Sequence, residues 1–242
     1  MAVSGRPWRA AEYAFVVLVS FIVLQTLLVI MHEFIHSTVA WLLGHMKSPF
    51  GIVWGNPLTL TGWDEGVEYS RLFAAGHRHA AAVIGVSPLV AHAAIVAAGL
   101  KLMKAGRPEN RWLFHVLYWF VTANFMELFA YITMASFVSG GDVGIFNRGL
   151  MVSPWLLFVG GSLAIAAGLK VLYGQVLPRV YALFACGNKS VEWMILLLTG
   201  CAIFLWGSGL RVAFYRYPDP QWLFGLIGVA AFCLTTVLYR PR

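Results

Sequence analysis

Long runs of apolar residues, separated by short polar segments, dominate the hydropathy pattern of this chain. We expect six of these runs to form membrane-spanning helices, because about 20 apolar residues cross a hydrocarbon core as a helix. The first run is longer than one perpendicular crossing requires, so its helix must tilt or emerge from the membrane. The six runs are residues 13–43, 80–103, 112–138, 154–173, 191–210 and 222–239. This pattern predicts an all-α integral membrane protein.

The longest polar connection, residues 44–79, follows the first predicted span. Its portion 48–62, SPFGIVWGNPLTLTG, places Pro, Gly and Asn around short β-prone pieces. Such punctuation favours a hairpin or a short re-entrant loop of β type over a helix. Elsewhere we find no repeat and no Ser/Pro-rich linker, so residues 1–242 are interpreted as a single polytopic membrane domain.

Composition narrows the class of protein further. Hydrophobic residues make up 60% of the 242 residues and charged residues only 11%, against roughly 25% charged residues in soluble domains. These values exclude a disordered chain, a coiled coil and an ordinary soluble enzyme. We expect a multi-pass protein of a bacterial inner membrane, with membrane lipids as constant partners.

The formal net charge of +7 would suggest a nucleic-acid partner in a soluble protein. Here the basic residues lie mostly between apolar runs, which is typical of topology signals and contacts with lipid head groups. We therefore expect no nucleic-acid partner. More Lys and Arg residues fall in the segments that are inside if the N-terminus is inside, which predicts cytoplasmic N- and C-termini.

One motif in the first predicted span indicates a metal site with a general base. His32, Glu33 and His36 form an HExxH sequence within an apolar run. Residues i and i+4 share one face of a helix, so both imidazoles can bind one metal ion. Glu33 lies beside that face, where it can accept a proton from an attacking water and later deliver it to a leaving amine. We interpret Glu33 as the general base.

HExxH also occurs by chance in helices without a metal. The membrane favours the functional interpretation, because two His and a Glu within an apolar span are costly to bury without a role. Two imidazoles and a carboxylate suit Zn²⁺, with one position left open. A membrane di-iron oxygenase is disfavoured, because the chain has only 7 His and no adjacent His pair.

The segment 29–44, VIMHEFIHSTVAWLLG, resembles the first core helix of the site-2 protease family of intramembrane zinc metalloproteases. The following SPFGIVWGN is similar to the short β-type loop that re-enters the membrane in that family. The resemblance implies a zinc-dependent hydrolase that cleaves peptide bonds of transmembrane substrates within or next to the membrane. It also implies that an edge strand in residues 48–62 holds the substrate in extended form.

The third metal ligand has two candidates. The family supplies an Asp from a later core helix, and Gly141-Asp142 matches a looser form of that motif, although its usual Asn-x-x-Pro segment is absent. We favour Asp142, because the glycines let its backbone approach the site closely; it could also cap the short helix after it. The rival is Glu127, as a ligand or as a hydrogen-bond partner of a ligating His. Asn124 shares a helix face with Glu127, and the resemblance implies a role in substrate binding.

These inferences predict that residues 1–152 form a catalytic core of three spans and that residues 153–242 add three more spans. His92, deep in the second predicted span, could pair with Glu127 or be a packing residue. A second function stays open, in which the chain is a non-proteolytic scaffold or accessory subunit of a membrane complex with a structural or vestigial metal site. Its partners would then be other membrane subunits. A general base at Glu33 would distinguish the protease from the scaffold, because a structural metal site needs no general base.

Overall fold

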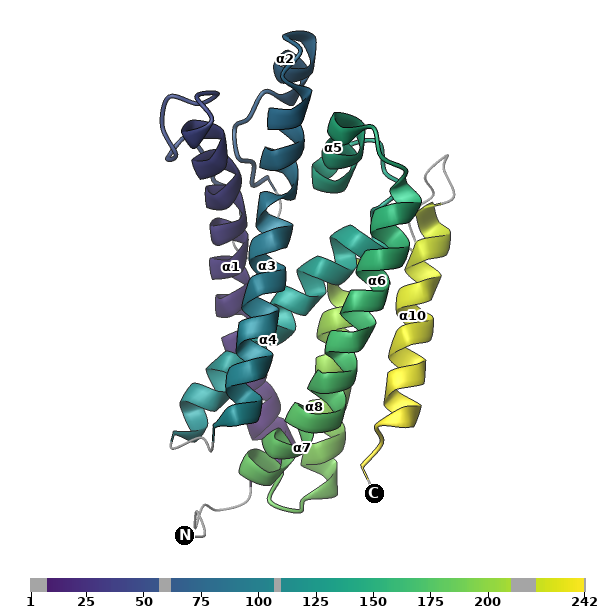
Figure 1. Ribbon diagram of the computed structural model, residues 1–242. Coiled ribbons are helices and arrows are strands. Elements are labelled where there is room, and N and C mark those ends of the chain that lie inside the picture. Colours follow the sequence, from purple (N-terminus) through teal and green to yellow (C-terminus); the bar gives the residue numbers. More distant parts are fainter. Residues whose placement is uncertain (1–7, 57–61, 107–109, 210–220, 242) are drawn as a thin grey trace.

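The computed structural model describes residues 8–56, 62–106, 110–209 and 221–241, which form a bundle of helices (Figure 1). Five helical segments are long and apolar enough to cross a membrane: Ala10–Leu42, Arg78–Ala105, Arg111–Met134, Pro154–Ala185 and Lys189–Trp206. Trp222–Leu238 is apolar but shorter. The expectation of an all-α protein with several spanning helices is confirmed, whereas the number of six spans stays a prediction. The predicted end of the fifth run, Leu210, lies outside the described residues.

The helical elements follow one another along the chain, and four of them, labelled η, are π-helical. They are α1 (Ala10–Leu42), α2 (Tyr69–Ala74), α3 (Arg78–Ala105), α4 (Arg111–Leu128), η1 (Phe129–Met134), α5 (Gly141–Leu150), α6 (Pro154–Val171), η2 (Leu172–Val176), α7 (Leu177–Val180), η3 (Tyr181–Ala185), α8 (Lys189–Gly200), η4 (Cys201–Gly209) and α10 (Gln221–Leu238).

Helix α1 is a continuous helix of 33 residues. Its sequence contains neither Gly nor Pro, so nothing interrupts the backbone hydrogen bonds that a lipid environment requires to be made internally. At about 1.5 Å per residue it is roughly 50 Å long, more than a hydrocarbon core is thick. One face, including Val17 and Leu28, is buried in the bundle, while Phe15 and Ile22 are exposed on the other. Exposed apolar side chains on this face suit contact with lipid.

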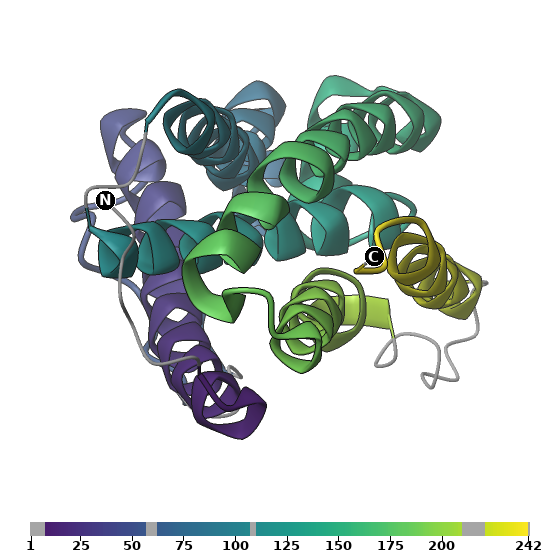
Figure 2. The same cartoon turned by 90° about the horizontal axis from the view of Figure 1, so that it is seen from below.

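Helix α4 runs obliquely through the middle of the bundle, where it packs against α1, α3 and η4 (Figures 1 and 2). Its side chains Tyr118, Trp119 and Phe125 are almost completely buried in the largest hydrophobic cluster. The predicted third span reached residue 138, but the regular helix ends earlier and passes into η1. A π-helix is uncommon and often lies near a functional site.

Helix α5 packs closely against α3 at one end of the bundle (Figure 1). Glycines allow this approach: a Cβ at Gly85 of α3 would lie 3.0 Å from the carbonyl oxygen of Asp142 and 3.0 Å from Cγ2 of Ile145. At the start of α5, Gly141 has a φ of 69°, which glycine adopts at little cost. The N-cap is Gly140, so Asp142 lies in the first turn and is not the cap that the sequence suggested.

The connection after α1 folds back against that helix. The Ser37 hydroxyl donates to the carbonyl oxygen of Pro49 at 2.7 Å, and Phe34 contacts Phe50 edge to face. Val53 and Asp64 form an isolated antiparallel bridge. Residues 57–61 of the predicted hairpin or re-entrant loop lie outside the described residues, so its re-entry into the membrane stays a prediction.

Candidate metal centre

His32 and His36 occupy one face of α1, as their spacing predicts, and both side chains are buried inside the bundle. Their Nε2 atoms lie 3.2 Å apart. On His36, Nδ1 lies 2.8 Å from the carbonyl oxygen of Ile84 in α3. A carbonyl can only accept, so Nδ1 carries a proton, and in the neutral imidazole Nε2 then keeps its lone pair. The free lone pair points to the place where the two imidazoles meet.

Asp142 joins this pair from α5, although more than a hundred residues separate it from His36 in sequence. Its Oδ2 lies 3.0 Å from Nε2 of His32, and its Oδ1 lies 3.3 Å from Nε2 of His36. The donor atoms of the three residues all lie within 4.8 Å of one another. Oδ2 is fully buried and accepts no hydrogen bond of adequate geometry. A buried carboxylate oxygen without a partner is costly, and a cation would satisfy it.

The spacing of the donor atoms fits a small metal ion. Ligand atoms about 2.0–2.1 Å from a tetrahedral zinc ion lie roughly 3.3–3.4 Å from one another. The two Nε2 atoms are 3.2 Å apart, and Nε2 of His32 and of His36 lie 3.0 and 3.3 Å from the two different carboxylate oxygens of Asp142. The buried group of His32, His36 and Asp142 could therefore hold a metal ion.

The surroundings of Asp142 favour the ionised form of its carboxyl, which is the form that binds a metal. Asp142 belongs to α5, which is not one of the long apolar spans. Burial alone would raise the pKa of its carboxyl, but the neighbouring imidazoles of His32 and His36 hold that pKa below its ordinary value. The first turn of a helix also favours negative charge. The group is thus ionised at neutral pH, as a metal ligand must be.

Glu33 is buried next to this group on α1, with 9% of its side chain exposed. Its carboxyl interacts electrostatically with both imidazoles and with Asp142. The carboxyl makes no hydrogen bond to the described residues, so its oxygens are available to a water or a substrate. Glu33 is therefore close enough for its charge to act on the two imidazoles, and its role as general base stays a prediction.

Glu127, the rival third ligand, lies outside the group formed by the two imidazoles and Asp142. It is half-buried in α4 and close enough for its charge to act on His32 and Asp142. Asn124, one turn earlier, is completely buried. Its Oδ1 accepts from Nδ1 of His92 at 2.8 Å, and its amide donates to the carbonyl oxygen of Phe120 at 2.8 Å. Its role in substrate binding stays a prediction.

Sequence reasoning missed two residues that touch His32. Nε2 of His92, in α3, lies 3.1 Å from Nδ1 of His32, whereas the suggested pairing of His92 with Glu127 is not formed. The ring of Tyr131 stacks on the His32 ring, with centroids 5.2 Å apart. Neither residue belongs to a motif. The only signal was the position of a polar side chain deep inside an apolar span.

Tyr69, at the start of α2, brings a further polar group toward the centre. Its hydroxyl is buried and has no hydrogen-bond partner of adequate geometry. Burial, together with the charge of Glu65, raises the pKa of Tyr69 well above its ordinary value, so the hydroxyl keeps its proton. Asp142 and Glu33 also act on it electrostatically. A protonated hydroxyl near these carboxylates is a potential hydrogen-bond donor.

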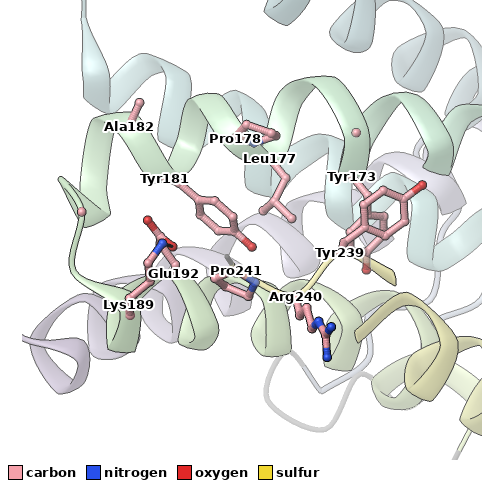
Figure 3. A pocket seen from close by; sticks show the side chains of 12 residues that line it. Tyr173, Leu177, Pro178, Tyr181, Ala182, Lys189, Glu192, Tyr239, Arg240 and Pro241 are labelled. Carbon is pink, nitrogen blue, oxygen red and sulfur yellow. Dashed lines mark hydrogen bonds and ion pairs between the residues drawn. The ribbon is translucent and has the colours of Figure 1, made fainter. Parts of the chain in front are cut away.

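A separate cavity of about 710 Å³ lies at the opposite end of the bundle, around α7 and the start of α8 (Figures 1 and 3). Tyr173, Tyr181 and Tyr239 line it together with the ion pair of Lys189 and Glu192, whose charged atoms are 2.9 Å apart. It contains none of the metal-centre residues. The cavity therefore takes no part in the chemistry considered for His32 and His36.

Comparison of the chain with family models, curated proteins and solved structures gives no match. The functional assignment consequently rests on the geometry of the centre.

Proposed function

We propose that the chain is a zinc-dependent intramembrane metalloprotease, which hydrolyses peptide bonds of membrane-embedded or membrane-proximal substrates. The observation that carries this proposal is the convergence of His32, His36 and Asp142 beside the buried carboxyl of Glu33. Two nitrogens and one oxygen form a donor set that zinc accepts, and the three protein ligands found among the described residues leave one position open. Structural zinc sites are normally closed by four protein ligands, so the count favours catalysis over a structural role.

The chain's own residues provide the acid–base chemistry. Zinc, when bound, supplies a Lewis acid that polarises a carbonyl and acidifies water. Glu33 accepts a proton from the attacking water and transfers it to the leaving amine. Ile84 fixes the proton of His36 on Nδ1, which keeps Nε2 available as a ligand. The buried hydroxyl of Tyr69 is suitably protonated to donate to a developing oxyanion.

The connection after α1 supports the handling of an extended substrate. Val53 and Asp64 exchange two backbone hydrogen bonds of 2.7 and 3.2 Å, so this segment already has β-type backbone. The exposed side chains of Phe50 and Trp54 surround the Phe34 ring, which follows Glu33 in α1. A helical substrate must unwind before its peptide bond can react, and pairing with an extended segment would hold it in that form.

The test replaces Glu33 with Gln, which preserves size but cannot accept the proton. Hydrolysis should fall by about 10²-fold or more, the scale of general acid–base catalysis, while the metal content stays unchanged. The measurement compares membranes of cells that express wild type or E33Q, using mass spectrometry of new peptide N-termini within apolar segments. Glu12→Gln is the matched control, because Glu12 lies on the same helix and is exposed.

Cleavage products that appear with wild type and with Glu12→Gln, but not with E33Q, would support the protease. Equal products from E33Q and wild type would reject Glu33 as the base. No products from any form, with zinc bound in all of them, would favour a scaffold or accessory subunit with a structural site.

A further inference from the structure

A line of buried hydrogen bonds leads away from His32 to the backbone of another helix. Nδ1 of His32 lies 3.1 Å from Nε2 of His92, and Nδ1 of His92 lies 2.8 Å from Oδ1 of Asn124. The Asn124 amide nitrogen lies 2.8 Å from the carbonyl oxygen of Phe120. His32 is 4% exposed, and His92 and Asn124 are 0% exposed. These bonds are therefore shielded from bulk water.

The donor and acceptor of every hydrogen bond in this line are fixed by the Phe120 carbonyl at its end. The Phe120 carbonyl can only accept, so the amide nitrogen of Asn124 must face it and Oδ1 must face His92. His92 then donates from Nδ1, which leaves a lone pair on its Nε2. That lone pair accepts from Nδ1 of His32. With its proton on Nδ1, the neutral His32 ring keeps a lone pair on Nε2, which faces Asp142 and His36.

The two histidine ligands are thus held in different ways. His36 donates directly to a backbone carbonyl of α3, whereas His32 depends on two side chains from α3 and α4. The ring of Tyr131 stacks on His32 with an interplanar angle of 22°, which restrains the plane of the ring. Rotation about the remaining torsions is limited by the bond to His92.

We propose that His92 and Asn124 are positioning residues that set the tautomer and the orientation of His32 for metal binding. This inference rests on the metal centre of the proposed function, but it does not require proteolysis. Hydrogen-bonded partners of metal ligands fix their ring orientation and raise their basicity, and their loss typically costs about 10–100-fold in metal affinity. We expect a loss of that size when either member is removed.

The variants separate positioning from packing. In His92→Leu no acceptor remains for His32, whereas in His92→Gln an amide can still accept from His32 and donate to Asn124. In Asn124→Leu the oxygen that sets the tautomer of His92 is lost. The control is His115→Leu, which removes another buried imidazole with two side-chain partners, Tyr13 and Ser20. His115 belongs to α4 but takes no part in the metal centre.

The measurement is the zinc dissociation constant of each purified full-length protein in detergent, by competition with a chelator. A ¹⁵N NMR spectrum of histidine-labelled protein reports which ring nitrogen of His32 carries the proton. We expect His92→Leu and Asn124→Leu to bind zinc about 10–100-fold more weakly. His92→Gln should remain within a few-fold of wild type, and His115→Leu should not change affinity even if its stability falls.

Affinity in His92→Leu equal to that in His115→Leu would overturn the inference, as would a wild-type protein in which Nδ1 of His32 carries no proton. Wild-type protein that binds no zinc would overturn both this inference and the metal centre. Tight zinc binding without peptide hydrolysis would overturn the proposed protease and leave the role of His92 and Asn124 intact.

Discussion

At the scale of single residues, the metal centre combines two histidines from neighbouring turns of one helix with an aspartate from a helix distant in sequence. The i, i+4 spacing was sufficient to place His32 and His36 on one face, because helix geometry decides it. Asp142 was selected against Glu127 by a motif and by its glycine neighbours, and it is Asp142 that meets the imidazoles. His92 was missed because its contact with His32 depends on how α3 packs against α1.

Replacing each acidic candidate in turn tests whether Asp142 or Glu127 is the third metal ligand. In Asp142→Ala one of the three donors is lost, so zinc affinity should fall by more than about 100-fold, beyond the cost of losing a hydrogen-bonded partner. Glu127→Gln should retain most of the affinity, because Glu127 lies outside the group. Titration of both variants with zinc measures this. The reverse ranking would assign the ligand role to Glu127.

At the scale of elements, individual helices could be predicted from the sequence, whereas the packing of one helix against another could not. The long apolar runs correspond to helices in the structure, and the uninterrupted α1 follows from the absence of Gly and Pro. The short α5 and its close packing on α3 could not be predicted, because contact between helices distant in sequence depends on side-chain complementarity. Gly85 makes that contact possible.

We therefore expect Gly85 to affect the metal centre through its packing against the backbone of Asp142. In Gly85→Val the new side chain would collide with Asp142 and Ile145 of α5, which should displace Asp142 and weaken zinc binding at least about 10-fold, as loss of a positioning contact does. Gly160→Val in α6 is the control, because no atom lies within 4 Å of a Cβ built there. The zinc dissociation constants of the two variants provide the comparison. Equal constants would show that the packing of α5 on α3 does not position Asp142.

At the scale of the whole molecule, the candidate metal centre lies toward one end of a largely apolar helical bundle. The centre lies where α1, α3 and α5 meet, and the cavity at α7 lies at the other end (Figures 1 and 3). The start of α1 and the end of α10 lie at the same end of the bundle (Figure 1). The cytoplasmic position of the termini, and a bacterial inner membrane as the location, stay predictions from sequence.

The central claim is that α1 and α5 together hold one metal ion, and the zinc content of the purified full-length protein tests it most directly. We expect about one zinc per chain in the wild type, because three donors converge on one point, and a strong loss in His36→Ala. His115→Leu should keep its zinc. Equal zinc content in wild type and in a His32→Ala, His36→Ala double variant would contradict the account.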